Sequence, residues 1–377
     1  MSISSSHRLA ATGAAGRRSG RRPSLIHGSP SRRRIGRALG AERTLQIALG
    51  VIWLLDGALQ LQPFMFTQSF VTQIIAPNTI GQPGFVAGPI KLIEHLIEPR
   101  VALFNVFAAT IQILIGVGLL YRPTVRAALL TSFAWAFGVW WIGEVLGGLF
   151  TGTASPLTGA PGAALLYILA GLIAWPRAHS HTRRNTARGA LAEWGALGAW
   201  AFLWLGSAAL WLLPANRSAD AVHDQIANAP SGASWLSSIH SSLTAATAGH
   251  GLVIAIAAAG LSAAIGLTAL LDRWTRPFVA LSVVIALIYF VIGQGICGIL
   301  TGSGTDPGTG PLLILLAIAI YTLRQSRLPS GSGIRPRDAS SRRLRGTGSN
   351  LRRTAHPTRI ADAAVQARAV TLHPPGT

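Results

Sequence analysis

The chain has 377 residues, of which 50% are hydrophobic and only 12% are charged, and its formal net charge at pH 7 is +20. An average soluble domain carries about 25% charged residues, so this composition argues against a water-soluble protein. The apolar residues come in blocks of roughly 17 to 26, the length that crosses a bilayer, and a core in water could not bury so many. The sequence predicts a polytopic membrane protein, with the lipid bilayer as its first partner.

The basic residues lie in the two tails and in short segments between the apolar blocks. A strongly basic chain can bind nucleic acid. Arginines beside apolar blocks, however, are typical of the positive-inside rule, by which basic loops stay in the cytoplasm. We therefore expect no nucleic-acid partner and assign the arginines to membrane orientation.

In chain order, residues 1–43 are rich in serine, glycine and arginine, and we predict a disordered basic tail there. Apolar segments that we interpret as eight spans follow near residues 45–62, 101–121, 127–149, 160–176, 195–213, 246–271, 277–300 and 308–323. Residues 177–194 are predicted to be a basic linker and residues 324–377 a second disordered tail. Eight spans put both tails and every arginine-rich loop on one side. This predicts a multi-pass protein of the bacterial cytoplasmic membrane with both termini in the cytoplasm.

The loop after the first predicted span contains "PFMFTQSFVTQII". Its residues Phe66, Phe70 and Ile74 recur at helical spacing, as do Val71 and Ile75. This pattern favours a short amphipathic helix in the membrane interface. A loop that packs over the helix bundle is the alternative.

The chain repeats itself at a spacing of about 150 residues. "WLLDGALQLQP" from Trp53 resembles "WLGSAALWLLP" from Trp204, and "IGVGLLYRPTVR" from Ile115 resembles "IGLTALLDRWTR" from Ile265. We therefore predict two four-span units, residues 44–176 and 195–323, below called the first and second halves. Because four is even, both enter the membrane in the same direction. The predicted fold is an all-α membrane protein, with eight transmembrane helices in two parallel-repeat four-helix bundles.

A glycine-rich passage also occurs twice, as "IGEVLGGLFTG" from Ile142 and "IGQGICGILTG" from Ile292. The pairs Gly148/Gly152 and Gly298/Gly302 have the GxxxG spacing that lets helix backbones approach closely. A packing device at the end of the third and seventh spans is one interpretation. The other is the lining of an outward-facing cavity, since interrupted spans at matching places of two repeats indicate a binding site.

Asp56 and Glu144 are the acidic residues that fall inside predicted spans, and both lie at similar depth near the outer face. A charge at mid-bilayer costs roughly 2.5–3.5 kcal/mol, so it needs a partner or a function. Arg100 stands at the start of the second predicted span, and Asn105 lies about 7.5 Å inside that span. We expect an Asp56–Arg100–Glu144 cluster with Asn105 beside it, either as a polar site or as a polar knot that fixes helix packing.

The second half has Ser207, His250, Ala255 and Gln294 at the corresponding places, so the first half is the better site candidate. The candidate polar site is then Asp56, Arg100, Asn105, Glu144, His250 and Gln294. His250 has no second ligand at i+3 or i+4, and Cys297 is the only cysteine, so we predict no metal site and no thiol chemistry. No nucleophile triad, phosphate loop or dinucleotide motif is present, which favours a protein that is not an enzyme.

"LGVIWLLDGALQL" from Leu49 and "QILIGVGLLYRPTVRAALL" from Gln112 are similar to the first span and the second-span hairpin of DoxX-like membrane proteins. The resemblance implies a four-span unit in each half and a link to membrane redox systems, because some relatives are quinone-reactive subunits of thiosulfate oxidation. It also implies a membrane redox or accessory protein as a partner.

These observations favour a non-catalytic membrane component or accessory subunit that binds a lipophilic small molecule or a membrane partner. Two alternatives stay open: a small-solute transporter with an outward-facing polar site, and a membrane subunit of a quinone-linked oxidoreductase. No cofactor is predicted, apart from the quinone that the last alternative would need.

Overall fold

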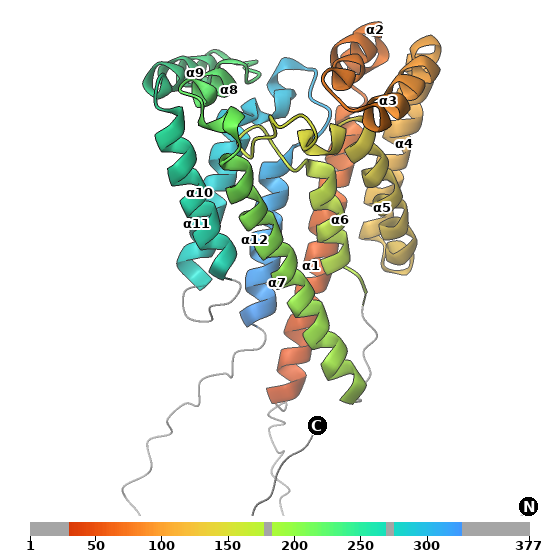
Figure 1. The fold of residues 1–377 in the computed structure, drawn as a ribbon. Helices are drawn as coiled ribbons and strands as arrows, with labels where there is room; N and C mark the ends of the chain where they lie inside the picture. The colour runs from red at the N-terminus through yellow and green to blue at the C-terminus, as the bar shows by residue number, and fades with distance from the viewer. Residues whose placement is uncertain (1–29, 177–182, 269–274, 326–377) are drawn as a thin grey trace, which may run out of the picture. The chain divides into compact units, whose positions relative to one another are not determined.

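The structure is a computed structural model that describes residues 30–176, 183–268 and 275–325 (Figure 1). These residues belong to one compact unit and form α-helices with short 3-10 and π turns, and no strand occurs among them. The predicted all-α class is therefore confirmed for this part of the chain. The predicted tails over 1–29 and 326–377, the linker segment 177–182 and the basic loop 269–274 lie outside the described residues.

The helices of the first half are α1 (Pro30–Leu59), α2 (Gln68–Phe70), α3 (Gly84–Ile97), α4 (Val101–Leu120), α5 (Val125–Ile142) and α6 (Ala163–Ile173). Those of the second half are α7 (Arg183–Trp211), α8 (Ala221–Ala227), α9 (Ser234–Thr247), α10 (Gly251–Leu267), α11 (Thr275–Ile288) and α12 (Thr309–Gln325).

Two helices begin earlier than the sequence predicts. Residues 30–43 were expected to belong to a disordered tail and 183–194 to a linker, yet they form the first turns of α1 and α7. Arginine and alanine are strong helix formers, and each segment continues directly into a buried helix that nucleates it. Composition alone therefore set the predicted boundaries too late.

The long helices pack in corresponding pairs in the two halves. Helix α1 packs against α4 as α7 packs against α10, and α5 packs against α6 as α11 packs against α12. Helices α6 and α12 also contact each other, and α1 contacts α12. Figure 1 shows α6, α12, α1 and α7 in the middle, with α4 and α5 on one side and α10 and α11 on the other. One apolar core runs through both halves, including Leu49, Leu166, Trp204 and Leu312.

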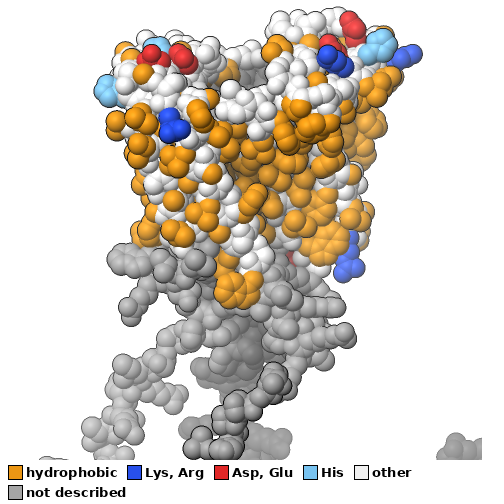
Figure 2. All heavy atoms as spheres, viewed as in Figure 1, with side chains coloured by type: hydrophobic (Ala, Val, Ile, Leu, Met, Phe, Trp, Pro, Cys, Tyr) orange, Lys and Arg blue, Asp and Glu red, His pale blue; other side chains and the backbone are white. Residues whose placement is uncertain are grey.

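The sides of the bundle are apolar. Figure 2 shows a broad hydrophobic band along the helices, and most charged side chains of the described residues visible in this view are gathered at the upper end. Large apolar side chains such as Leu103, Phe202 and Val253 are exposed there, as expected for contact with lipid. Among the described residues, three helical segments are long and apolar enough to cross a membrane: Gly84–Leu120, Arg122–Ile142 and Arg276–Gly293.

A fourth span is reached if α9 and α10, which are bent by 105°, are counted as one. The described residues thus form a helical protein with three or four candidate membrane spans. The eight-span arrangement remains a prediction, because α6 and α12 offer only shorter apolar stretches. Helices α1 and α7 have strongly basic first turns, and α1 carries Asp56 in its apolar part.

The segment after α1 is helical, as expected, but it packs on the protein. Residues Pro63–Phe66 and Val71–Ile75 form single 3-10 and π turns on either side of α2. Phe70, Val71 and Ile75 are buried in a second apolar cluster with residues of α3, α4 and the turn after α5. The packing over the bundle that the alternative expected is therefore found, but in helical turns and not in a loop.

The two glycine-rich passages form matching left-handed turns. Positive φ angles occur at Val145, Leu146, Gly147 and Gly148 and again, 150 positions later, at Gly295, Ile296, Cys297 and Gly298. Gly152 and Gly302 are also left-handed. The GxxxG interpretation is wrong, because these glycines lie in turns and not on a helix face. The left-handed region costs a residue with a β-carbon about 1–2 kcal/mol, so Val145, Leu146, Ile296 and Cys297 store strain.

Candidate functional site

Each left-handed turn follows a polar side chain that caps the last helix of its half. Both carboxylate oxygens of Glu144 accept the backbone N–H of Ala164, at 3.0 and 3.1 Å, in the first turn of α6. In the second half, Oε1 of Gln294 accepts the backbone N–H of Thr309 at 3.0 Å, and Nε2 donates to the hydroxyl of Thr309 at 2.8 Å. The first N–H groups of a helix have no partner within the helix, and the macrodipole there favours a negative charge.

Gly162 makes this arrangement possible in the first half. Its φ is +108°, and a β-carbon at this position would clash with Oε2 of Glu144. We expect Gly162→Ala to lower the free energy of unfolding by about 1–3 kcal/mol, the cost of a strained φ, and to displace Glu144. Gly260→Ala on α10 is the matched control, since a β-carbon added there would meet nothing within 4 Å; helix propensity should make it slightly stabilising. Thermal unfolding of both variants in detergent checks this, and equal melting temperatures would contradict it.

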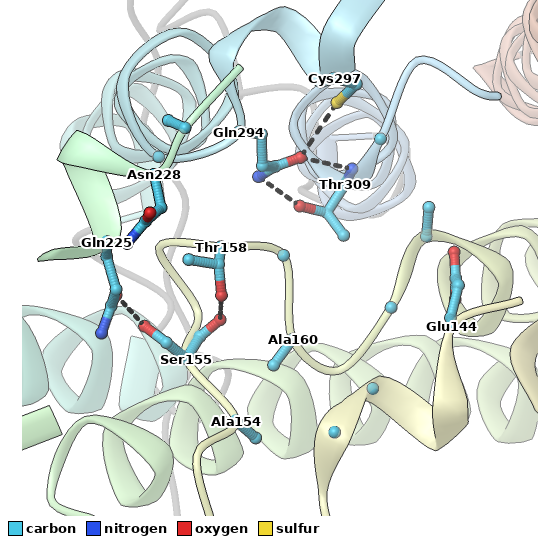
Figure 3. A pocket seen from close by; sticks show the side chains of 18 of the residues that line it. Glu144, Ala154, Ser155, Thr158, Ala160, Gln225, Asn228, Gln294, Cys297 and Thr309 are labelled. Carbon is cyan, nitrogen blue, oxygen red and sulfur yellow. Dashed lines mark hydrogen bonds between the residues drawn. The ribbon is translucent and has the colours of Figure 1, made fainter. Parts of the chain in front are cut away.

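A polar cavity of about 700 Å³, the upper cavity, lies between the two glycine-rich passages and α8 (Figure 3). Glu144, Ser155, Gln225, Gln294 and Asp306 are among the polar side chains that line it. The expectation of a cavity lined by these passages is met, because Gly147, Gly148, Gly159, Gly162, Gly293 and Gly308 belong to its wall.

The loops that bound the upper cavity interlock the two halves. Nε2 of Gln62 donates to the carbonyl of Gly304 at 3.0 Å, and Nδ2 of Asn216 donates to the carbonyl of Ala154 at 2.8 Å. The Ser155 hydroxyl donates to Gln225 at 2.7 Å. Each loop before α6 and α12 thus contacts the other half. This exchange brings Asp306, from the second half, into the wall of the first.

A second cavity of about 290 Å³, the inner cavity, lies inside the first half between α1, α4, α5 and α6. Most of its wall is apolar or aromatic, including Trp53, Phe70, Phe104 and Trp135, and Asp56 and Tyr167 also line it. Ala134 and Gly138 also line it and are exposed on the surface of α5. The inner cavity therefore reaches the outer surface of the helix bundle beside α5.

Asp56 is 2% exposed, and it is held by a hydrogen bond that the Tyr167 hydroxyl donates to Oδ2. The ring of Tyr167 packs against Trp53 with 4.3 Å between centroids, and Nε1 of Trp53 donates to Ser132 at 3.1 Å. The other carboxylate oxygen, Oδ1, has no hydrogen-bond partner among the described residues.

Three further buried polar atoms of the inner cavity also lack a partner in this part of the chain, namely Oε1 of Gln60, Oε1 of Gln112 and Nε1 of Trp135. An unpaired buried polar group costs about 1–3 kcal/mol. Such groups are rare in native proteins. Several of them around one cavity indicate a site that is completed by a ligand.

Glu144, Ala163, Thr305 and Asp306 line both cavities, so the two adjoin at a pair of carboxylates. Glu144 follows the end of α5 and Asp306 precedes α12, so both lie outside the spanning helices. The pKa of the Glu144 carboxyl is raised to about 8, first by burial and then by the negative charge of Asp306. Burial also raises the pKa of Asp306, although Thr305 and the backbone N–H of Gly308 donate hydrogen bonds to it.

The prediction that Arg100 pairs with Asp56 and Glu144 is wrong. Arg100 is exposed at the start of α4, and the charges that act on Asp56 and Glu144 belong to other carboxylates. The side chain can extend into water there, which costs less than entering the bundle. Asp56 and Glu144 do line one cavity, as expected from their similar depth.

Of the other predicted site residues, only Gln294 lines a cavity. Asn105 is fully buried and donates to the backbone carbonyls of Met65 and Val101, which ties the segment after α1 to α4. His250 is exposed, and its Nδ1 lies 2.7 Å from the carbonyl oxygen of Ala248. Asn105 and His250 therefore have structural roles at helix ends.

Beside Ser207 and Tyr289 of the second half lies a cavity of only about 20 Å³, far smaller than the inner cavity. The aligned sequences place Trp211 opposite Gln60 and Tyr289 opposite Val139. Both large side chains are buried, and Nε1 of Trp211 donates to the Tyr289 hydroxyl at 3.0 Å. In the second half, aromatic side chains fill the space that corresponds to the inner cavity of the first half.

Asp306 and Tyr167 were missed by sequence reasoning. Tyr167 is the one tyrosine in the predicted fourth span, and its phenol could have been matched to a buried acid. Asp306 lies in a loop, and acidic residues are common on exposed loops, so the sequence does not single it out. Only the interlocking of the two halves brings it to Glu144.

Among the described residues, no group of three or more His, Cys, Asp or Glu side chains could hold a metal ion. No family model matches the chain, and no curated protein and no solved structure matches it either.

Proposed function

We propose that this protein is a non-catalytic, membrane-embedded binding protein for a lipophilic small molecule, which occupies the inner cavity. The observation that carries the proposal is a largely apolar cavity with unpaired buried polar atoms at Asp56, Gln60 and Gln112. Ligand sites are mostly apolar and have a few polar groups that fix orientation. At about 290 Å³ the cavity is near the lower limit for drug-sized ligands.

The proposed architecture is eight spans in two parallel four-span repeats of a DoxX-like type. Support comes from the corresponding helix pairs α1/α4 and α7/α10, from the left-handed turns 150 residues apart and from the matching caps at Glu144 and Gln294. Helices α6 and α12 are short because the chain enters each of them from a turn that lies within the upper end of the bundle.

The eight-span topology predicts which loops face the cytoplasm. A reporter that is active only outside the cytoplasm should be silent when fused after Arg188, because the arginine-rich 177–194 segment stays inside. The same reporter should be active when fused after Asn216, beyond α7. Activity after Arg188 and silence after Asn216 would refute this topology.

Filling the inner cavity should abolish binding. Val139 lines this cavity, and the second half has Tyr289 at the corresponding position. We expect Val139→Tyr to fold and to retain none of the lipophilic molecule that co-purifies with the wild type. Val253→Tyr is the matched control, because Val253 is 68% exposed on α10.

Native mass spectrometry of the two variants and the wild type, purified in parallel, makes the comparison. A quinone bound to the wild type would identify the redox alternative, and a co-purifying protein would identify an accessory role beside ligand binding. Equal occupancy in Val139→Tyr and the wild type would refute the proposed site.

Transport is a second candidate function. The observation that favours it is the junction of an open polar cavity with the apolar one at Glu144 and Asp306. A solute could pass from one to the other by exchange with protons on these carboxylates. Uptake or release of a bound solute by proteoliposomes, driven by a pH gradient and lost in Glu144→Gln, distinguishes a transporter from a binding protein.

A further inference from the structure

Both cavities are acidic in a chain that is otherwise strongly basic. Asp56, Glu144, Asp224 and Asp306 line one cavity or both, which is four of the 12 acidic residues of the chain. Within the described part of the chain, no lysine, arginine or histidine lines either cavity. The cavities therefore become negative as these carboxyls ionise, opposite in sign to the net charge of +20.

One carboxylate oxygen of Asp56 also lacks a hydrogen-bond donor. Oδ1 of Asp56 is buried without a partner among the described residues, and the amide oxygens of Gln60 and Gln112, residues that are 8% and 5% exposed, are unpaired as well. These three atoms are acceptors, and a group with several donors, such as an ammonium, satisfies acceptors of this kind. Nε1 of Trp135, which is also unpaired in this cavity, is a donor and takes no part in holding an ammonium.

The rest of the inner cavity suits a cation with an apolar body. Trp53, Trp135, Phe70, Phe104 and Tyr167 surround the approach to Asp56. Aromatic faces attract cations, by about 0.5–1 kcal/mol at exposed sites and about 2 kcal/mol or more when water is excluded. The apolar wall binds the hydrocarbon part.

We propose that the ligand class of the inner cavity is a lipophilic primary amine, bound as its ammonium ion at Asp56. This inference rests on the proposed function. The ammonium donates to the carboxylate and the two amide oxygens, and its hydrocarbon part lies among the aromatic rings. Glu144 and Asp306 line the junction with the upper cavity and attract cations toward it. Anions and zwitterionic lipid headgroups are rejected, because the described residues of the wall include no basic side chain that could pair with a phosphate or carboxylate.

Three probes of one shape test the charge: 4-phenylbutylamine, 4-phenylbutanol and 4-phenylbutyrate. Binding is measured at pH 8.5 by calorimetry on the full chain in phosphatidylcholine nanodiscs, with empty nanodiscs subtracted. We expect the amine to bind at least 10-fold more tightly than the alcohol, and the acid not to bind. The Val139→Tyr variant, with a filled cavity, should bind none of the three.

The outcomes separate the two proposals. If the alcohol or the acid binds as tightly as the amine, and Val139→Tyr removes that binding, the cavity is a ligand site but the ammonium assignment is wrong. If none of the probes binds, or if Val139→Tyr binds them as the wild type does, the proposed function fails together with the inference. Amine selectivity that is lost in Val139→Tyr supports both.

Discussion

Replacing Asp56 by asparagine should weaken binding of 4-phenylbutylamine by about 10- to 100-fold. The variant loses a hydrogen bond to a charged group, which contributes about 1.5–3 kcal/mol, and each 1.4 kcal/mol is a factor of ten. Asparagine still accepts the hydrogen bond that Tyr167 donates to Asp56, so the fold should persist. Binding of the neutral alcohol should change little, and calorimetry in nanodiscs measures both.

Glu98→Gln is the control for Asp56→Asn. Glu98 is an exposed acid at the end of α3 and lines neither cavity, so its neutralisation should leave the amine affinity unchanged. An Asp56→Asn protein that is folded and binds the amine as the wild type does would show that this carboxylate does not hold the ammonium.

Amine binding should strengthen as the pH rises toward about 8. The Glu144 carboxyl has a pKa raised from 4.5 to about 8, so it is protonated at pH 6 and ionised at pH 9. The amine, with a pKa near that of lysine at about 10.4, remains a cation throughout. Since a cation favours the ionised carboxylate, affinity should rise by up to about tenfold per pH unit below the pKa if one proton is released.

The other titratable groups around Glu144 are Asp56, Asp306, Asp224, Tyr167 and Cys297. Asp306 also has a raised pKa, so its titration adds to the pH dependence. Glu144→Gln should flatten the dependence, and Glu144→Gln with Asp306→Asn should flatten it further. Glutamine suits the position, because Gln294 caps α12 at the equivalent place.

Stability should respond to pH in the opposite direction. Because the folded state holds the Glu144 proton more tightly than the unfolded state, the wild type should lose stability as the pH rises from about 4.5 to 8. Above pH 8, Glu144→Gln should therefore melt at a higher temperature than the wild type. Wild-type stability and amine affinity that both stay constant over this window would contradict the role of Glu144.

Much of this molecule could be predicted from the sequence, for identifiable reasons. The apolar blocks and the low charge predict a helical membrane protein. The scarcity of acids within those blocks singles out Asp56 and Glu144, since a charge there needs a compensating role. Substitution of these acids by Ser207 and Gln294 also identifies the first half as the site candidate.

The rest depended on three-dimensional information that the pattern lacks. Depth along a helix does not give the direction of a side chain, so Arg100 was placed inward when it extends outward. Asp306 reaches Glu144 only through a loop from the other half. The inner cavity is open because Val139 and Gln60 are smaller than Tyr289 and Trp211, which stand at the corresponding places of the second half. Volume differences of this kind become visible only when the packing is known.

Photolabelling tests most directly whether the inner cavity of the first half is a ligand site. A phenylbutylamine with a diazirine on its ring is irradiated with the full chain in nanodiscs, and the labelled peptides are mapped by mass spectrometry. We expect labels on cavity residues of α4, α5 and α6, such as Ala108, Trp135 and Tyr167, and their loss in Val139→Tyr. Labels spread over lipid-facing residues such as Leu103 and Val253, equal in the wild type and Val139→Tyr, would contradict it.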